Sequence, residues 1–266
     1  MKTSIYYGVN AALYFHMEGK HILIDGLHEG EISGFSPMSS SLDRDLKLDQ
    51  GIFGMLDAAI FTHKHPDHFS RRKLDILHEH RPALAVFAPG EGMPGDLINV
   101  AVKKENAKLL SFDIGSVKIY AIRNIHEGEP YYDDPHCSFL LQSEKESYFI
   151  GGDAILLPEE ISYFEDKLKR PVTAAFVNVY QAASESGKEY LHRLSPKRTF
   201  LYHLPLPKDD PGCYHRLAQQ LHERLQETAA EGEIESEHYS CAVTDGRVTV
   251  CLRARCSENI AKERKK

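Results

Sequence analysis

The sequence predicts a mixed α/β fold built from layers of strands and helices. Short apolar runs bounded by polar, Gly or Pro positions recur along most of the chain, which is typical of buried strands. Between and after them lie segments with apolar residues at helical spacing, which is typical of helices with one buried face. A third observation points to a site, because one apolar run ends in the heptapeptide Thr-His-Lys-His-Pro-Asp-His, residues 62–68. Strands and helices of this kind bury their apolar faces against one another in stacked layers.

The expected strands follow the apolar runs in chain order. They are residues 11–15, 21–25, 57–62, 84–88, 117–122, 138–142, 148–151, 172–179 and 199–203. The expected helices begin at residues that favour a helix start: Ser70 before residues 71–80, Pro158, and Pro211. We expect their apolar stripes to be core and not cofactor contacts. These stripes are Leu74 and Leu77; Ile161, Phe164 and Leu168; and Tyr214, Leu217, Ala218, Leu221 and Leu225.

Length and composition indicate one domain. The chain has 266 residues, of which 42% are hydrophobic and 27% charged, as is ordinary for a soluble globular protein. Candidate ligands run from His63 to His203 without a linker, so we expect a single domain over residues 1–256 and a polar, frayed tail over 257–266. The formal net charge of −7 does not favour a nucleic-acid backbone as the main partner.

The cysteines and the N-terminus indicate a cytoplasmic protein. The five cysteines lack the spacing of a metal site or a disulfide framework, which indicates reduced thiols, although Cys251 and Cys256 lie close enough in sequence to pair. A single Lys2 precedes the first strand-like segment, and the apolar run at 11–15 is too short for a signal peptide. No apolar stretch approaches the roughly 18 residues that a membrane span needs, so we expect no membrane contact.

The heptapeptide concentrates metal-binding side chains. His63, His65, Asp67 and His68 place three imidazoles and one carboxylate within six positions. Imidazole nitrogen and carboxylate oxygen are the usual ligands of zinc and of other divalent metals. Alternation in an extended chain sends His63 and His65 to one side, and Pro66 then ends the strand, so that Asp67 and His68 can face a second metal. The alternative, a polar surface loop, does not account for so dense a set of ligands.

With these residues the chain resembles the metallo-β-lactamase superfamily of metal-dependent hydrolases, whose signature is His-x-His-x-Asp-His after a buried strand. The small, lactonase-like members are the most similar. Further segments match the family in its order over about residues 10–205: 19–26, a strand ending in Asp; 124–126; 149–154, a strand ending in Gly-Asp; and 200–203, a strand ending in His. The resemblance implies a four-layer αββα sandwich with the ligands on loops at one edge.

The resemblance also implies a dinuclear metal site. One metal would be held by His63, His65 and His126, the other by Asp67, His68 and His203, with Asp153 as the bridge. The two ions would share a hydroxide made from water, polarise the substrate oxygen and stabilise the leaving group. Asp67 and Asp153 are the candidate catalytic residues. Donors of this kind without cysteine suit two zinc ions, and manganese or iron fits them too.

Outside the heptapeptide, each assignment has a structural alternative. His126 also fits a solvated turn, Asp153 a helix cap, and His203 a satisfied core histidine at the end of an apolar strand. His136 lies near tyrosines and aspartates in an expected loop over the site, and we expect it to support the site without binding metal.

The loop over residues 26–56 is expected to shape the mouth of the site, as the corresponding loop does in the family. Within it, Phe35 and Met38 are either apolar substrate contacts or anchors for the loop. Lys197 and Arg198 are either contacts for an anionic substrate group or simply solvated.

The function that these features predict is hydrolysis of a small ester or a cyclic ester such as a lactone, with a small molecule as the partner. No Gly-x-Ser-x-Gly nucleophile or Walker phosphate loop offers a different chemistry. One alternative is a phosphodiesterase acting on a nucleotide or RNA, against which the acidic balance counts. Another is a non-hydrolytic iron redox protein or a sensor, although flavodiiron-type proteins typically carry Glu where this chain has His65.

Overall fold

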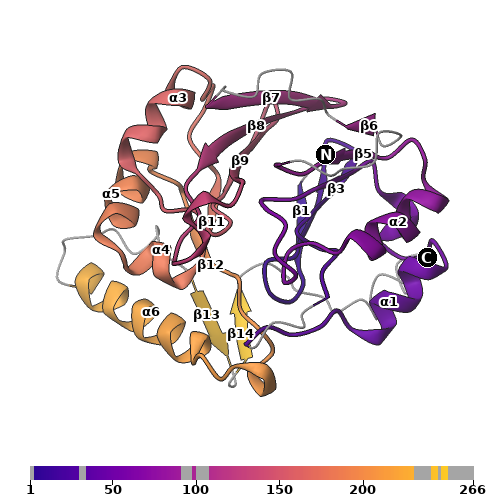
Figure 1. Ribbon diagram of the computed structural model, residues 1–266. Coiled ribbons are helices and arrows are strands. Elements are labelled where there is room, and N and C mark those ends of the chain that lie inside the picture. Colours follow the sequence, from indigo (N-terminus) through magenta and orange to yellow (C-terminus); the bar gives the residue numbers. More distant parts are fainter. Residues whose placement is uncertain are drawn as a thin grey trace, which may run out of the picture.

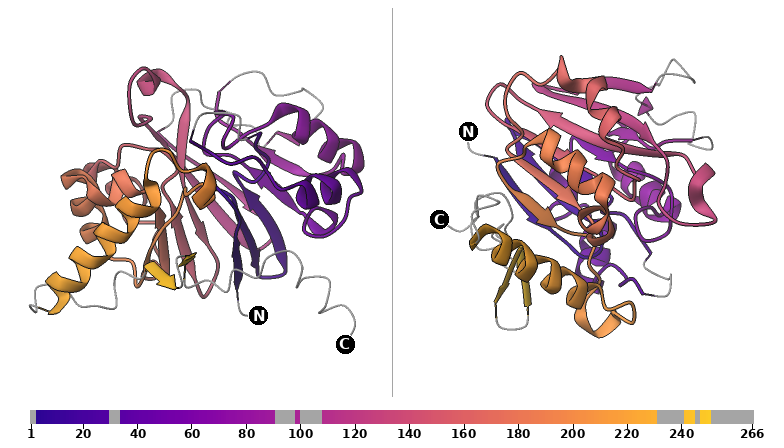
Figure 2. Two further views of the ribbon diagram at one scale, coloured as in Figure 1. Left: turned by 90° about the horizontal axis from the view of Figure 1, so that it is seen from below. Right: turned by 90° about the vertical axis from the view of Figure 1, so that its left-hand side faces the viewer.

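Two six-stranded sheets stand face to face at the centre of the protein, and helices cover the outer face of each (Figure 1). The computed structural model describes residues 3–29, 34–90, 98–99, 108–230, 241–244 and 247–250. The views in Figure 2 show the same order of layers from two further sides. The expected four-layer αββα sandwich is therefore confirmed.

In each sheet the strands that come first along the chain pair antiparallel, and those that come last pair parallel. The first contains β1 (Ser4–Tyr7), β2 (Leu13–Met17), β3 (Lys20–Ile24), β4 (Ala58–Ile60), β5 (Ala85–Phe87) and β6 (Ile98–Asn99), in that order. The second contains β12 (Thr199–Leu201), β11 (Ala174–Val177), β10 (Ser147–Ile150), β9 (His136–Gln142), β8 (Val117–Asn124) and β7 (Leu109–Ile114). Pairing is parallel from β3 to β6 and from β10 to β12, so the carboxyl ends of these strands meet at common edges.

The helices lie on the outer faces of the two sheets. The first sheet carries α1 (Ser40–Lys47) and α2 (Arg71–His80); the second carries α3 (Ser162–Glu165), α4 (Val179–Ala183), α5 (Glu185–Leu194) and α6 (Tyr214–Ala230). Single 3₁₀ turns are η1 (Phe53–Met55), η2 (Tyr131–Asp133), η3 (Pro158–Ile161) and η4 (Pro207–Asp209), and a hairpin joins β13 (Cys241–Thr244) to β14 (Arg247–Val250). No helix in the described part of the chain is long and apolar enough to cross a membrane.

Strand periodicity distributes side chains between the layers. In β3, Ile22 and Ile24 enter the core between the sheets, whereas Leu23 packs in the outer cluster with Leu46 of α1 and Leu74 of α2. Both faces of the parallel strands are therefore covered by apolar side chains, which is why these strands appear in the sequence as uninterrupted apolar runs.

Three expected boundaries are refined by local hydrogen bonds. The helix over residues 71–80 is found as expected, and the Ser70 hydroxyl accepts the Lys73 N–H at 3.2 Å. The strand expected over 172–179 ends at Val177, because Asn178 caps α4 in a capping box with Gln181. The helix expected at Pro211 begins at Tyr214, where the Asp210 carboxylate accepts the first amide protons.

Several elements were not among those expected. The loop over residues 26–56 contains α1 and η1, and α5 begins in a polar stretch with a glycine in its first turn. Gly187 is needed there, because a Cβ would clash with the Gln181 carbonyl oxygen at the turn from α4 into α5. The expected tail over 257–266 and the pair Cys251 and Cys256 lie outside the described residues.

Candidate metal centre

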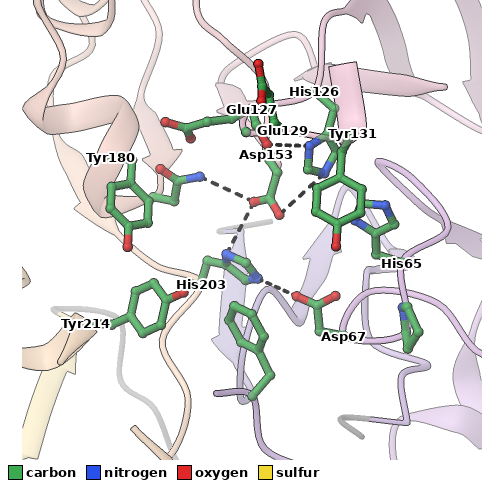
Figure 3. A pocket seen from close by; sticks show the side chains of 14 residues that line it. His65, Asp67, His126, Glu127, Glu129, Tyr131, Asp153, Tyr180, His203 and Tyr214 are labelled. Carbon is green, nitrogen blue, oxygen red and sulfur yellow. Dashed lines mark hydrogen bonds and ion pairs between the residues drawn. The ribbon is translucent and has the colours of Figure 1, made fainter. Parts of the chain in front are cut away.

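The candidate ligands all follow the carboxyl ends of strands at one edge of the sandwich. The heptapeptide follows β4, His126 follows β8, Asp153 follows β10 and His203 follows β12. Figure 3 shows these loops converging on Asp153 at the centre of the site. The layered scaffold thus brings together donors that are far apart in the sequence.

The ligand atoms form two compact groups. One consists of His63, His65 and His126, and the other of Asp67, His68, Asp153 and His203; within each group the ligand atoms lie within 4.8 Å of one another. Asp153 lies between the groups, with its Oδ2 3.2 Å from Nε2 of His68 and 3.8 Å from Nε2 of His63. The structure therefore brings together all seven candidate ligands, with Asp153 between the two groups.

Buried imidazole nitrogens without partners indicate that the first group fits a metal ion. Nδ1 of His126 donates to the Glu127 carbonyl oxygen at 2.7 Å, and Nδ1 of His63 lies 3.0 Å from the Thr62 hydroxyl. Each ring then presents its Nε2 to the site, and in the described part of the chain neither Nε2 has a hydrogen-bond partner although both are buried. Burial lowers the pKa of both histidines, which keeps them in the neutral form that binds metal.

His65 completes this group through its other nitrogen. Its Nε2 lies 2.7 Å from a carboxylate oxygen of Asp134, so Nδ1 is the atom left for a metal. A carboxylate on the far nitrogen of a ligating histidine fixes its tautomer and raises its basicity. Asp134 thus acts on the site through His65.

The second group is oriented by Asp25. This fully buried carboxylate accepts Nδ1–H of His68 at 3.0 Å and both the N–H and the hydroxyl of Thr62, at 2.8 and 2.7 Å. Nε2 of His68 therefore faces Asp67 and His203. Burial opposes a charge on His68, but the carboxylates of Asp153, Asp67 and Asp25 outweigh it and raise the pKa of His68 well above its usual value.

The Asp153 loop is held in place from three sides. The Gly152 N–H donates to the Tyr202 hydroxyl at 2.8 Å, the Asp153 N–H donates to Nε2 of His136 at 2.9 Å, and Gln181 donates to the Gly152 carbonyl at 3.1 Å. Gly152 has φ +59° and lies so close to His136 that a Cβ would be 2.5 Å from Nε2. Among the described residues His136 belongs to neither ligand group, and its Nε2 accepts the backbone N–H of Asp153.

A pocket of about 500 Å³ opens onto the two groups. Its lining beyond the ligands includes Phe35, Tyr131, Tyr180, Tyr214, Asn178, Glu127 and Glu129. Of the two apolar residues in the long loop, Phe35 reaches this pocket, where its ring stacks on His203 at 4.6 Å, whereas Met38 is buried in the outer core. Lys197 and Arg198 are exposed before the amino end of β12 and do not line the pocket.

Four residues of the site had no role in the sequence analysis. Asp25 was noted there only as the end of a strand, yet it orients His68. Asn178, which donates to Asp153 at 3.3 Å, could have been found as a helix cap directly after a strand. Asp134 and Tyr202 carry no local sequence signal, because both act across long separations in the chain.

Comparison with known proteins addresses the fold. No protein-family model matches the sequence. Protein Rv0786c of Mycobacterium tuberculosis is 28% identical over 174 residues, which are 62% of this chain and 75% of that protein. Among solved structures, the metallo-β-lactamase fold protein YhfI from Bacillus subtilis superposes with a TM-score of 0.55 at 13% identity, over 91% of this chain and 94% of YhfI.

The chain has the metallo-β-lactamase fold. The isothiocyanate hydrolase from Delia radicum gut bacteria has a TM-score of 0.55 at 18% identity, over 94% of this chain and 99% of that one. The diiron β-hydroxylase CmlA from Streptomyces venezuelae has a TM-score of 0.59 at 14% identity and is covered over 90% of this chain. This chain spans about half of CmlA, 52% of its length. The resemblance that the heptapeptide suggested thus holds for the fold.

Proposed function

We propose that this protein is a metal-dependent hydrolase that cleaves a small ester or lactone. The observation that carries the proposal is the pair of ligand groups that meet at Asp153, in which the buried Nε2 atoms of His63 and His126 have no hydrogen-bond partner among the described residues. A pocket of about 500 Å³ lies within the usual range for small-molecule sites, so a small molecule is the proposed substrate.

The residues would divide the work by position. His63, His65 and His126 would hold one divalent ion, and Asp67, His68 and His203 the other, with Asp153 between them. Two such ions supply Lewis acidity and activate water at neutral pH. Asn178 orients the Asp153 carboxylate by a hydrogen bond of 3.3 Å, and Phe35 covers the ring of His203. In the overall reaction water adds a hydroxyl to the carbonyl carbon and a proton to the leaving oxygen, and no oxidant is needed.

The donor set favours zinc as the cofactor, with manganese or iron as alternatives. Iron deserves a separate test because CmlA, which shares the fold, is described as a diiron β-hydroxylase. A non-hydrolytic iron protein is therefore the second candidate function. We also propose that the protein acts in the cytoplasm, where free thiols such as those of Cys137 and Cys213 stay reduced.

The first experiment measures metal content in protein purified without added metal. We expect about two transition-metal ions per chain in the native protein and a clear loss in the His65→Ala variant, because His65 belongs to the first ligand group. The variant should still fold, because the side chain of His65 is 21% exposed and contributes little to the core. His192→Ala is the matched control, since His192 is exposed on α5 and belongs neither to the ligand groups nor to the pocket lining of the described residues.

Turnover is then measured on a panel containing a γ-lactone, an aryl ester and an aryl phosphodiester. Hydrolysis of the first two with bound zinc or manganese, lost in His65→Ala and kept in His192→Ala, supports the proposal. Protein that binds no metal even after reconstitution would overturn it. Iron with oxygen-dependent activity and no hydrolysis would favour the second candidate.

A further inference from the structure

The wall of the pocket beyond the ligands is aromatic on two sides. Tyr131 lies over His65 with ring centroids 4.7 Å apart, at one side of the ligand cluster. On the side of His203, Phe35 contacts Tyr214 at 5.6 Å and Tyr214 meets the edge of Tyr180 at 5.9 Å. Figure 3 shows Tyr131 and the pair of Tyr180 and Tyr214 on opposite sides of Asp153.

The rings of Tyr131 and Tyr180 are partly exposed and available to contact a ligand. Tyr131 and Tyr180 are each 45% exposed and rank among the most exposed large apolar side chains that the structure describes. Both line the pocket. An aromatic face that borders a pocket and remains open to it favours apolar groups and cations, because the face of the ring carries negative charge.

The charged groups of the wall are acidic. Glu127 and Glu129 line the pocket beside Asp67 and Asp153, and no lysine or arginine is among the lining residues of the described chain. Burial raises the pKa of Glu127 to about 7, so Glu129 is the wall carboxylate on which the charge preference mainly depends. Metal ions bound to the two groups would concentrate positive charge beside Asp67 and Asp153. The non-reacting part of a substrate would meet the tyrosines and the two glutamates instead. A phosphate or carboxylate on that part would be repelled and would find no cationic partner.

We propose that the pocket selects a carbonyl substrate whose non-reacting part is apolar or cationic, and that it rejects substrates with an anionic group there. This inference rests on the proposed hydrolase function and narrows its substrate class. It argues against lactones that carry a phosphate group on the part of the molecule that does not react. Tyr131, Tyr180, Glu127 and Glu129 are the specificity-determining residues.

The test uses three acetate esters of similar size that differ in one terminal group: trimethylammonium, the uncharged tert-butyl isostere, and carboxylate. The metal-loaded protein should give kcat/KM values in the order cationic, neutral, anionic, with at least about a tenfold span from first to last. The double variant Glu129→Gln with Tyr180→Ala should reduce that span to about threefold or less. Glu185→Gln is the matched control, because the side chain of Glu185 is 92% exposed on α5 and outside the pocket lining.

Binding of the matching non-hydrolysable ethers, followed by calorimetry, separates this inference from the proposed function. Ether binding in the expected order without hydrolysis of any ester would support the charge preference and refute the hydrolase function. Hydrolysis with the anionic ester as good as the neutral one would refute the inference and leave the hydrolase function standing. A span unchanged in the double variant would refute the assignment to these residues.

Discussion

Asp25 fixes the ring of His68, and its replacement by asparagine tests whether that orientation governs metal binding. One carboxylate oxygen accepts the Thr62 N–H at 2.8 Å; the other accepts the Thr62 hydroxyl at 2.7 Å and Nδ1–H of His68 at 3.0 Å. Asparagine has the same shape but presents an NH₂ group at one of these positions, and that group cannot accept a proton. With the NH₂ toward His68, the histidine must move its proton to Nε2, which is the atom that faces the metal site.

The size of the effect follows from the burial of these groups. An N–H donor that faces another donor inside a fully buried network lowers the free energy of unfolding by about 1–3 kcal/mol. Loss of the group that orients a ligating histidine lowers metal affinity by about 10- to 100-fold. Binding of the metal ion held through His68 should be weakened more than binding at the group of His63, His65 and His126, because His68 contacts Asp25 directly whereas His63 reaches it only through the Thr62 hydroxyl.

The assay is competition for zinc against a chromophoric chelator, fitted for two sites, with thermal melting of the metal-free protein alongside. Asp57→Asn is the matched control: Asp57 lies at the amino end of β4, away from the heptapeptide, and pairs with Lys20 at 2.8 Å. That variant should lose stability and keep both zinc affinities. Two unchanged affinities in Asp25→Asn, or an equal loss in Asp57→Asn, would refute the reasoning.

Three further perturbations address the rest of the site. Gly152→Ala should lower the free energy of unfolding by about 2 kcal/mol or more and reduce metal content, whereas Gly128→Ala, also at positive φ but with no atom within 4 Å of a Cβ, should keep its metal. Asp134→Asn should lower the affinity for one of the two zinc ions by about 10-fold in the same chelator assay. Removal of metal with a chelator should lower the melting temperature, by an amount that grows with the free zinc concentration of the reference sample, because the donors are assembled only in the folded chain.

Each of these has an outcome that contradicts it. Normal metal content in Gly152→Ala would show that the loop can shift without displacing Asp153. Unchanged zinc affinity in Asp134→Asn would mean that His65 is held by its backbone alone. If removal of metal leaves the melting temperature unchanged, these residues do not bind metal in the folded protein.

The strands and the ligand types were predictable because their signals are local. Buried parallel strands require continuous apolar runs, and β4 and β11 appear as such in the sequence. The heptapeptide holds four candidate donors within six positions, so no knowledge of the fold was needed to suspect a metal. The helix α5 was missed because its first turn is polar and contains Gly187, whose need arises only from its contact with α4.

By itself the sequence determined which side chains are able to bind a metal and where along the chain the strands that carry them end. Only the tertiary structure decided which residues hydrogen-bond to those side chains and which residues line the pocket beside them. Asp134 meets His65 across 69 positions and Tyr202 meets Gly152 across 50, and such pairs depend on how two sheets pack and not on any local pattern. The same is true of the pocket wall, where Phe35, Tyr131 and Tyr180 come from three separate segments. The periodicity of the sequence indicates which face of a helix or strand is buried. Which residues from distant segments become neighbours at the edge of the sandwich is decided only when the sheets and helices pack together.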